Sequence, residues 1–286
     1  MNRKPTFSIL TPTYNCEKYI LSSWENLCLQ TENNWEWVIV NDGSTDNSLE
    51  IINSLKDERI KIHTYDDNRG RGFARNLALS KASGDIIVIW DIDDLYFPDR
   101  LQKIKNAFSD KDIEYFCSYA LIVDNQLKIK GVRRFSSDNI FNKSFVHPTL
   151  AFRSSLLGSL KYGEGVAGED FGLMVYLDKK CKGYFCEEFL MLYLEDREIN
   201  LFKTLHFHRS FVQSSKRLIR EDILTFTPLS KLRFYATAYL KTIILHMMRI
   251  RPSLYLETVK FRHLELLSFD ELPQNRKNFI DSIKNR

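Results

Sequence analysis

The chain has 286 residues, of which 44% are hydrophobic and 27% charged, and these are ordinary values for a folded soluble protein. No low-complexity tract or internal repeat is visible, and the length suffices for one large α/β domain with an appendage. The net charge of +4 conceals an asymmetry, because residues 200–286 carry 16 Lys and Arg against 7 Asp and Glu, whereas residues 1–199 carry 25 against 30. This asymmetry indicates a basic C-terminal part that faces an anionic partner.

The five cysteines are scattered and form no C-x-x-C pair, which argues against a zinc knuckle or a redox motif and fits a reducing compartment. The apolar run near the N-terminus is too short for a signal peptide. No window of about 18 uncharged apolar residues exists, so we expect no transmembrane helix. These observations predict a cytoplasmic protein.

The first hundred residues alternate between strand and helix patterns. We expect strands over residues 6–12, 36–42, 60–65 and 85–90, and helices over 17–29, 46–55 and 72–81. The first helix should have Ile20, Leu21, Trp24, Leu27 and Cys28 on one side, and Asp46 can cap the second helix. Strands separated by helices of about ten residues predict βαβ units and a parallel sheet.

Beyond Pro98 the pattern changes. A helix over 99–108 precedes strand-like segments at 113–123, 127–135 and 147–153, a loop at 161–170 and a helix over 171–180. From about residue 203 the chain reads as helices. We expect one helical face made of Leu205, Val212, Leu218 and Ile219, and another made of Leu229, Leu232, Tyr235, Tyr239, Ile243 and Met247.

Polar loops follow each of the four predicted strands. They span residues 12–15, 41–44, 66–70 and 91–94, and three of them are acidic. In a parallel sheet, ligands bind beyond the carboxyl ends of the strands, so these loops should converge on one edge.

Asp91 and Asp93 form a D-x-D pair directly after a buried apolar strand. Carboxylates on a short turn suit Mg²⁺ or Mn²⁺, which then bridge substrate phosphates. The alternative is a solvated turn in which Asp94 or Asp99 caps the next helix. The position at the end of a parallel strand favours the metal.

Two further loops carry candidate nucleotide contacts. Asp42 either closes an Asx-type turn or accepts a hydrogen bond from a nucleobase N–H. Arg69, Arg71 and Arg75 surround a glycine-rich turn that opens a helix, which suits phosphate but also describes a basic surface loop. The segment contains neither a G-x-G-x-x-G fingerprint nor a Walker loop.

Glu169 and Asp170 stand at a predicted helix start, after a glycine-rich segment. Acidic residues there commonly complement the helix dipole, but a carboxylate beside a mobile loop could also be a general base. His147 either borders the acceptor site or is an ordinary histidine at a strand end.

Six segments in order carry a family resemblance: SILTPTYN, VNDGSTDNS, NRGRGFARN, IVIWDIDD, HPTLAFR and GEDFGL. Over about residues 5–180 the chain resembles the inverting family 2 glycosyltransferases with the GT-A fold. The resemblance implies a Rossmann-like, mostly parallel central sheet flanked by helices. It implies a catalytic domain over residues 1–200, divided into a nucleotide-binding half (1–98) and an acceptor-binding half (99–200), with a basic helical extension over 201–286.

The resemblance also assigns roles to matched positions. Nucleotide contacts are implied for Pro12, Tyr14, Asp42, Asn68, Arg71, Arg75 and Asp91, with Asp42 recognising uracil. Asp93 is the implied direct ligand of Mn²⁺ or Mg²⁺, assisted by Asp91, and Asp170 is the implied catalytic base. His147 and Glu169 are acceptor-side candidates. Asn41 departs from the family, which often has Asp there.

The implied activity is that of a metal-dependent hexosyltransferase. It would move a sugar from a nucleotide-sugar, UDP above all, to a hydroxyl of a glycan or lipid-linked glycan in the synthesis of capsule, O-antigen or a similar surface polysaccharide. A catalytically silent sugar-nucleotide binder or scaffold is an alternative. A nucleotidylyltransferase is disfavoured because no glycine-rich loop follows the first strand. Nucleic-acid binding has no recognised module in its support.

Residues 203–251 carry ten Lys and Arg and only two acids, interleaved with apolar residues. Amphipathic basic helices of this kind bind membrane surfaces, so the segment could contact the inner face of the cell membrane. Packing on the catalytic domain or formation of an oligomer is the open alternative.

Overall fold

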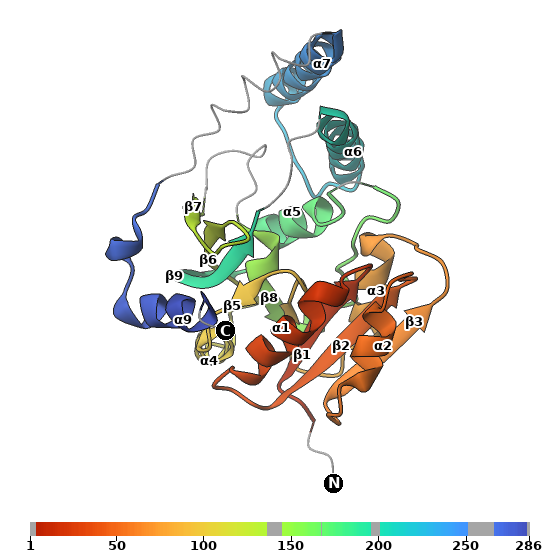
Figure 1. Ribbon diagram of the computed structural model, residues 1–286. Helices are drawn as coiled ribbons and strands as arrows, with labels where there is room; N and C mark the ends of the chain where they lie inside the picture. The colour runs from red at the N-terminus through yellow and green to blue at the C-terminus, as the bar shows by residue number, and fades with distance from the viewer. Residues whose placement is uncertain (1–3, 136–144, 167, 196–200, 251–265, 285–286) are drawn as a thin grey trace.

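The computed structural model describes residues 4–135, 145–166, 168–195, 201–250 and 266–284. It is an α/β fold built on a nine-stranded sheet with the order β3-β2-β1-β4-β8-β6-β9-β5, and β7 pairs with β6 beside this path (Figure 1). The sheet is mixed: its first half is parallel, and its second half combines antiparallel pairs with one parallel pair.

The parallel half comes from the first ninety residues, as the sequence predicts. Its strands are β1 (Phe7–Thr13), β2 (Trp35–Asp42), β3 (Ile60–Tyr65) and β4 (Ile86–Ile89). Its helices are α1 (Glu17–Cys28), α2 (Ser48–Ser54) and α3 (Arg71–Lys81). The pairing of β1 with β2 runs from Phe7 opposite Trp35 to Thr13 opposite Asn41, so both strands end at the same edge.

The second half adds shorter elements. They are β5 (Leu95–Tyr96), α4 (Arg100–Ala107), β6 (Tyr115–Val123), β7 (Ile129–Arg133), the 3₁₀ turns η1 (His147–Thr149) and η2 (Ser154–Leu156), β8 (Ala151–Arg153), α5 (Phe171–Lys180) and β9 (Gly183–Leu194). Strand β8 joins the halves, because it pairs antiparallel with both β4 and β6. The pattern analysis misses β9, which lies parallel to β6 and antiparallel to β5.

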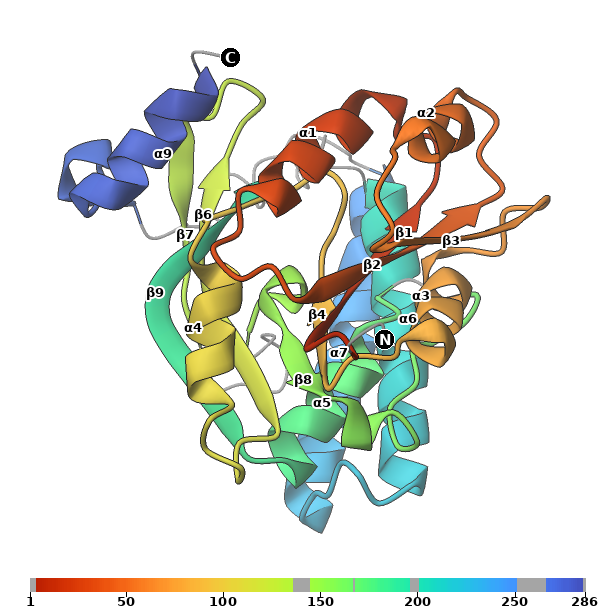
Figure 2. The ribbon, with the colours of Figure 1, turned by 90° about the horizontal axis from the view of Figure 1, so that it is seen from below.

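Alternating side chains of the sheet build two apolar layers. Ile86 and Val88 of β4, with Trp90 directly after the strand, join the layer of α1, α2 and α4, whereas Ile87 and Ile89 of β4 join the layer of α3 and α5. Figure 2 shows α1 and α2 on one face of the parallel strands and α3 on the other. A strand that is buried on both faces must be apolar at every position, which explains the uninterrupted run that precedes Asp91.

The buried side of α1 coincides only in part with the apolar side that the sequence predicts. Leu21 is 54% exposed and Cys28 is exposed as well, whereas Ser23 and Asn26 are buried. The two polar side chains face the core because they have partners there: Trp90 Nε1 donates to Ser23 Oγ at 2.9 Å. Asn26 Nδ2 donates to the Tyr96 carbonyl at 2.9 Å and Asn26 Oδ1 accepts from the Tyr96 amide at 2.8 Å.

The expected cap of α2 is displaced by one residue. The helix begins at Ser48, so Asn47 occupies the N-cap position and Asp46 lies outside the helix. The Asp46 carboxylate still accepts from the amides of Ser48 at 3.0 Å and Glu17 at 3.2 Å. It therefore ties the starts of α1 and α2 together.

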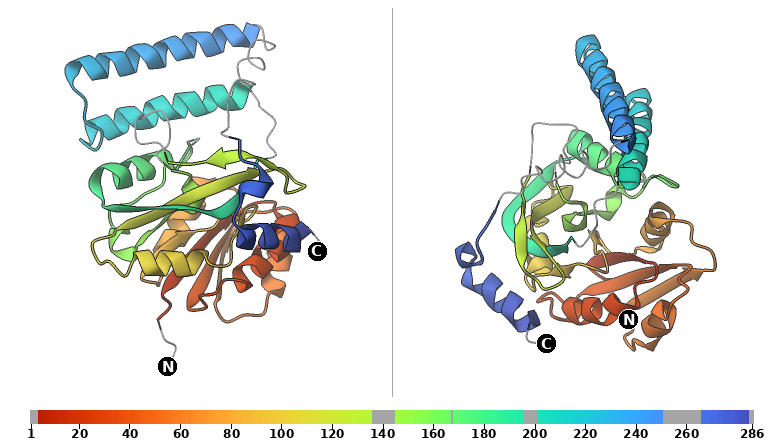
Figure 3. Two further views of the ribbon diagram at one scale, coloured as in Figure 1. Left: turned by 90° about the vertical axis from the view of Figure 1, so that its left-hand side faces the viewer. Right: turned by 45° about the horizontal axis from the view of Figure 1, so that its top comes forward.

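The basic segment forms a helical hairpin of α6 (Leu201–Arg220) and α7 (Pro228–Ile250). Helix α6 lies between α5 and α7, so α7 is the outermost layer (Figure 3). On α6, Leu205 and Leu218 are buried as expected. The six residues of the expected α7 face do share one side of the helix, where Tyr235 is half-buried and the other five are exposed. The helix packs through its opposite side, which carries Phe234, Ala238 and Leu245.

The C-terminal segment returns to the sheet. After η3 (Phe269–Glu271), α9 (Gln274–Lys284) buries Phe279 and Ile280 in a cluster with Phe97, Leu121 and Leu192. In the same helix the Arg276 guanidinium is buried, and its Nη2 lies 2.9 Å from Asp99 Oδ2.

The sequence boundary that places residues 201–286 in one extension stays a prediction. In the described part of the chain, neither α6, α7 nor any shorter helix has the length and apolar content that spanning a bilayer requires.

Replacing Ile280 with Ala tests whether α9 is part of the core. Ile280 is fully buried, so its loss should lower the free energy of unfolding by about 2–5 kcal/mol. Urea denaturation followed by circular dichroism measures this. The neighbouring exposed position supplies the control, since Asp281→Ala should change stability by less than about 0.5 kcal/mol. Equal effects of the two substitutions would contradict the packing of α9 on the sheet.

Candidate functional site

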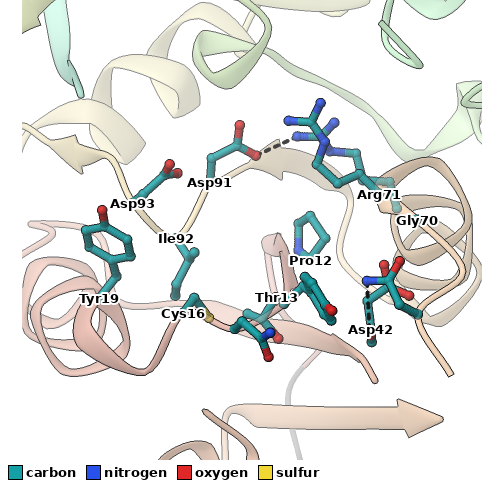
Figure 4. A pocket seen from close by; sticks show the side chains of 14 residues that line it. Pro12, Thr13, Cys16, Tyr19, Asp42, Gly70, Arg71, Asp91, Ile92 and Asp93 are labelled. Atoms are coloured by element: carbon teal, nitrogen blue, oxygen red, sulfur yellow. Dashed lines mark hydrogen bonds and ion pairs between the residues drawn. The ribbon is translucent and has the colours of Figure 1, made fainter. Parts of the chain in front are cut away.

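The loops at the carboxyl ends of the parallel strands surround one cleft of about 500 Å³. It is lined by Pro12, Thr13, Tyr14, Asn15, Cys16, Tyr19, Asp42, Asn68, Gly70, Arg71, Arg75, Asp91, Ile92 and Asp93. All eight residues that the sequence assigns to nucleotide or metal are among them. Asp93 lies toward one end of the cleft and Asp42 toward the other, with Pro12 and Thr13 between them (Figure 4).

The three acids after β4 have three different environments. Adjacent carboxylates repel one another, and their separate surroundings offset this repulsion. The Asp91 carboxylate forms an ion pair with Arg75, whose Nη2 lies 2.8 Å from Asp91 Oδ1. Asp94 is buried and accepts a hydrogen bond from the Leu194 amide at 2.9 Å, which ties the turn to β9. Asp93 is half-buried and lines the cleft. Asp91 is half-buried and lines the cleft as well, so two of the three carboxylates face a ligand there.

Arg75 is the buried cation of the site. Its side chain is 4% exposed, and it pairs with Asp91 through Nη2 and with Glu169 Oε1 through Nη1. Burial alone would lower the pKa of Arg75, but the two carboxylates raise it above its ordinary value, so the guanidinium is always charged. Arg71 adds a second cation, with Nε 3.3 Å from Glu169 Oε1.

The same pairing governs the protonation of Asp91. Burial would raise the pKa of Asp91, but Arg75 above all, with His147 and Arg71 nearby, holds it below its usual value. Asp91 is therefore a permanent carboxylate at neutral pH. Because one of its oxygens is bound to Arg75, its orientation is fixed before any ligand arrives.

Asp42 is held at the end of β2 by two donors. The Tyr65 hydroxyl and the Arg69 amide each donate to Asp42 Oδ1 at 2.7 Å, and Asn68 Nδ2 donates to the Asp42 carbonyl at 3.2 Å. Burial and the bond to Asp42 raise the pKa of Tyr65, so its hydroxyl keeps the proton that it donates. Both side-chain bonds use Oδ1, which orients Oδ2 as an acceptor for a ligand. Sequence reasoning missed Tyr65.

The loop after β1 is fixed by its neighbour. The Asn15 amide donates to Ser44 Oγ at 3.1 Å, and Asn15 Oδ1 accepts from the Thr45 amide at 2.8 Å. Tyr14 next to it is 48% exposed at the rim of the cleft, so its ring has a free face for stacking. Asn41, where the family often has Asp, donates through Nδ2 to Thr64 Oγ1 at 3.0 Å and so has a role within the sheet.

The segment before α5 lies against the start of α3. A Cβ added at Gly72 would come within 1.9 Å of the Gly163 carbonyl oxygen, so only glycine permits this approach. The Gly163 amide in turn donates to the Glu169 carbonyl at 2.9 Å. This contact places Glu169 within reach of Arg75, and Asp170 follows it as the buried N-cap of α5.

The remaining acceptor-side candidate, His147, is buried as well. Its Nε2 lies 2.9 Å from the Tyr162 hydroxyl, and the Tyr162 ring faces the Arg75 guanidinium at 5.5 Å. His147, Glu169 and Asp170 are thus gathered behind Arg75 and are not part of the cleft lining. Their roles in catalysis stay predictions.

Two acids of the cleft, Asp91 and Asp93, offer oxygen donors of the kind that suits a divalent ion. The described residues contain no group of three or more His, Cys, Asp or Glu that could hold a metal by itself. Asp93 and Asp91 nevertheless supply hard oxygen donors, and Mg²⁺ is commonly bound by one or two carboxylates plus the phosphates of a substrate. The residues present fit an ion that arrives with a phosphate.

The comparisons with known proteins agree with this geometry. Residues 8–179 match the family described as Glycosyl transferase family 2. EpsE of Bacillus subtilis, named provisionally as a glycosyltransferase, is 32% identical over 212 residues, which cover 69% of this chain and 76% of that protein. WfgD of Escherichia coli, a UDP-Glc:alpha-D-GlcNAc-diphosphoundecaprenol beta-1,3-glucosyltransferase, is 33% identical over 126 residues, which cover 44% of this chain and 50% of that protein.

Two solved structures share the fold. TarS 1–349 of S. aureus, in complex with UDP-GlcNAc, aligns with a TM-score of 0.61 and 22% identity over 75% of this chain and 66% of that chain. The mannosyltransferase PcManGT of Pyrobaculum calidifontis, in complex with GDP-Man and Mn²⁺, aligns with a TM-score of 0.60 and 19% identity over 84% of this chain and 70% of that chain.

Fold and family agree on the class: this is a glycosyltransferase with the GT-A fold. The chain belongs to glycosyltransferase family 2. The resemblance predicted from the six sequence segments is thereby confirmed.

Replacing Asp91 with Asn tests the buried pair. At neutral pH the substitution should cost about 1–3 kcal/mol of unfolding free energy, because Arg75 loses one of its two counter-charges. The pKa of Asp91 is lower in the folded state, so this advantage of the wild type should be complete above about pH 4, the ordinary value for Asp, and should shrink as the pH falls through the lowered value. Urea titrations of both proteins between pH 7 and pH 2.5 measure the difference. A difference independent of pH would show that the charge of Asp91 is not what stabilises the pair.

Proposed function

We propose that the protein transfers a sugar from a UDP-sugar to a hydroxyl of a glycan or lipid-linked glycan acceptor, with inversion at the anomeric carbon and with the help of Mn²⁺ or Mg²⁺. The observation that carries this proposal is the arrangement of polar groups in the cleft. Asp42 offers an oriented carboxylate acceptor, and Arg71, Asp91 and Asp93 form a separate cluster of charged side chains. A nucleoside diphosphate has the matching order, with a base at one end and charged phosphates at the other.

The base is recognised at the end of β2. Asp42 Oδ2 is oriented to accept the N–H of uracil, and the exposed ring of Tyr14 can stack on the pyrimidine beside Pro12. A carboxylate selects a base that presents a donor at this point. The bound UDP-GlcNAc of TarS and the UDP-Glc in the name of WfgD support UDP as the donor nucleotide here.

The phosphates are placed beside Arg71 and Asp93. Arg71 is exposed at the cleft and can bind a phosphate oxygen through its guanidinium. Asp93, assisted by Asp91, would hold a divalent ion that neutralises the diphosphate and so improves it as a leaving group. The Mn²⁺ in the complex of PcManGT supports such an ion.

Proton transfer falls to Asp170. The carboxylate stands at the start of α5, next to Glu169, which Arg75 connects to the cleft wall. We assign to it removal of the proton from the acceptor hydroxyl, whose oxygen forms the new bond to the anomeric carbon while the bond from that carbon to the diphosphate oxygen breaks. Attack from the face opposite the diphosphate inverts the configuration. A base of this kind typically contributes about 10²–10⁴ in rate.

Nucleotide specificity can be measured without knowing the acceptor. Calorimetric titration of UDP, GDP and dTDP, each with and without Mn²⁺, should show binding of UDP that depends on the metal and is lost in Asp93→Ala. Asp85→Ala is the matched control, because Asp85 is exposed and lies directly before β4, whereas Asp93 follows the strand. Its UDP affinity should equal that of the wild type. Binding of UDP by Asp93→Ala with full affinity in the presence of Mn²⁺ would remove Asp93 from the metal site.

The base can be tested through hydrolysis of the donor, in which water replaces the acceptor. Release of UDP from UDP-sugars should fall about 10²–10⁴-fold in Asp170→Asn, whereas its affinity for UDP should stay unchanged. Asp178→Asn, a substitution two turns further along α5, should leave both quantities unchanged. Full activity of Asp170→Asn would refute its assignment as the base. Absence of hydrolysis and of transfer in the wild type, despite binding of UDP, would indicate a silent binding protein.

A further inference from the structure

Helix α7 carries a row of exposed apolar side chains. We call this row the outer stripe, and it consists of Leu229, Leu232, Tyr239, Leu240, Ile243, Ile244 and Met247. Each is between 39% and 70% exposed. Scattered exposed apolar residues are normal on a protein surface, but a row that runs along one helix indicates a contact surface.

The outer stripe is not the packing face of the helix. Helix α7 packs against α6 through Phe234, Ala238 and Leu245, which are 3–5% exposed. At 100° per residue these positions lie opposite the stripe. Because α6 separates α7 from the rest of the molecule, the stripe faces away from the catalytic body (Figure 3). No described element of this chain covers it.

The hairpin around the stripe is strongly basic. Over their full lengths α6 and α7 contain nine Lys and Arg and no Asp or Glu. These cations are Lys203, Arg209, Lys216, Arg217, Arg220, Lys231, Arg233, Lys241 and Arg249. Arg209 and Lys216 line a small groove between the helices that Thr242 closes from α7. The Arg209 guanidinium also lies 3.2 Å from His246 Nε2 of α7, so this cation of α6 lies at the junction of the two helices.

Charge decides between the two occupants that could cover an apolar stripe. A second copy of the hairpin would bring cations against cations, because neither helix has a carboxylate to pair with them. A bilayer that contains anionic lipids satisfies both features, since its acyl region accepts the apolar side chains and its phosphates attract the Lys and Arg residues.

We propose that the outer stripe is a docking surface for the anionic face of a phospholipid bilayer. Helix α7 lies in the plane of the interface, with Leu232, Tyr239 and Ile243 inserted below the head groups. Arg233, which is exposed and lies on the side of α7 that carries the stripe, contacts the head-group phosphates. This surface does not depend on the donor site, and it would bring the cleft to acceptors that carry a lipid.

Flotation with lipid vesicles tests the proposal. The full chain should bind vesicles of equal parts phosphatidylglycerol and phosphatidylcholine, should bind pure phosphatidylcholine far more weakly, and should be released progressively by salt. The double substitution Leu232→Asp with Ile243→Asp should weaken binding by about tenfold or more, because it places two charges in the part of the helix that enters the lipid. Both positions are exposed, so the helix should remain folded, which circular dichroism verifies.

The matched control applies the same change of charge elsewhere. Leu21 and Leu29 are exposed apolar residues on and directly after α1, with exposed fractions of 54% and 39%. The double variant Leu21→Asp with Leu29→Asp should bind vesicles like the wild type. Calorimetry with UDP, carried out on all three proteins, reports on the donor site separately, so a failure of lipid binding does not count against transferase function.

Two results would overturn the proposal. The first is equal vesicle binding by the wild type and by the stripe variant. The second is a wild type that ignores anionic vesicles; if sedimentation then shows a dimer that the stripe substitutions dissociate, the occupant of the stripe is a second copy of the chain. Binding to anionic vesicles that the stripe substitutions abolish and the control substitutions preserve would establish the surface.

Discussion

A guanidinium ion in a dry interior must stay beside its counter-charges, because separation would leave a bare charge without water. Arg75 is in this position, with Asp91 on one side and Glu169 on the other. Asp91 ends the fourth strand of the parallel half, and Glu169 comes from the segment before α5. One side chain therefore fixes the distance between the part of the molecule that we assign to the donor and the part that we assign to the acceptor. A reaction between two bound molecules needs that distance to be held closely.

The acids at the end of β4 share their tasks according to their partners. The Asp94 carboxylate accepts a hydrogen bond from the Leu194 amide of β9, and the Asp91 carboxylate is oriented by Arg75 before a ligand binds. Asp91 and Asp93 are both half-buried and both line the cleft. Arg100 stabilises the end of β4, because its fully buried guanidinium donates to the carbonyls of Ile89 at 3.1 Å and Pro148 at 2.8 Å. The turn that presents the D-x-D pair is thus held by a buried guanidinium that joins the end of β4 to the Pro148 carbonyl.

Much of the donor side could be predicted from the sequence, because it depends on local patterns. Apolar runs, caps and turns predict four parallel strands, and the topology alone brings Asp42, Arg71 and Asp93 to one edge. What could not be predicted depends on contacts between distant segments. The pairing of Glu169 with Arg75, the bond from Tyr65 to Asp42 and the return of α9 to the sheet leave no periodic signal. Helix α7 shows a different limit: it has two apolar sides, and its pattern cannot tell which one is packed.

The contact between Gly72 and Gly163 makes the assembly vulnerable at an inconspicuous place. The addition of one methyl group at position 72 would collide with backbone, which cannot move aside as a flexible side chain can. The segment that carries Glu169 would have to retreat, although no charged or polar atom of the cleft had been altered. An inactive descendant of this enzyme could therefore keep every acid and every arginine of its motifs, and a reader of motifs alone would count it as active.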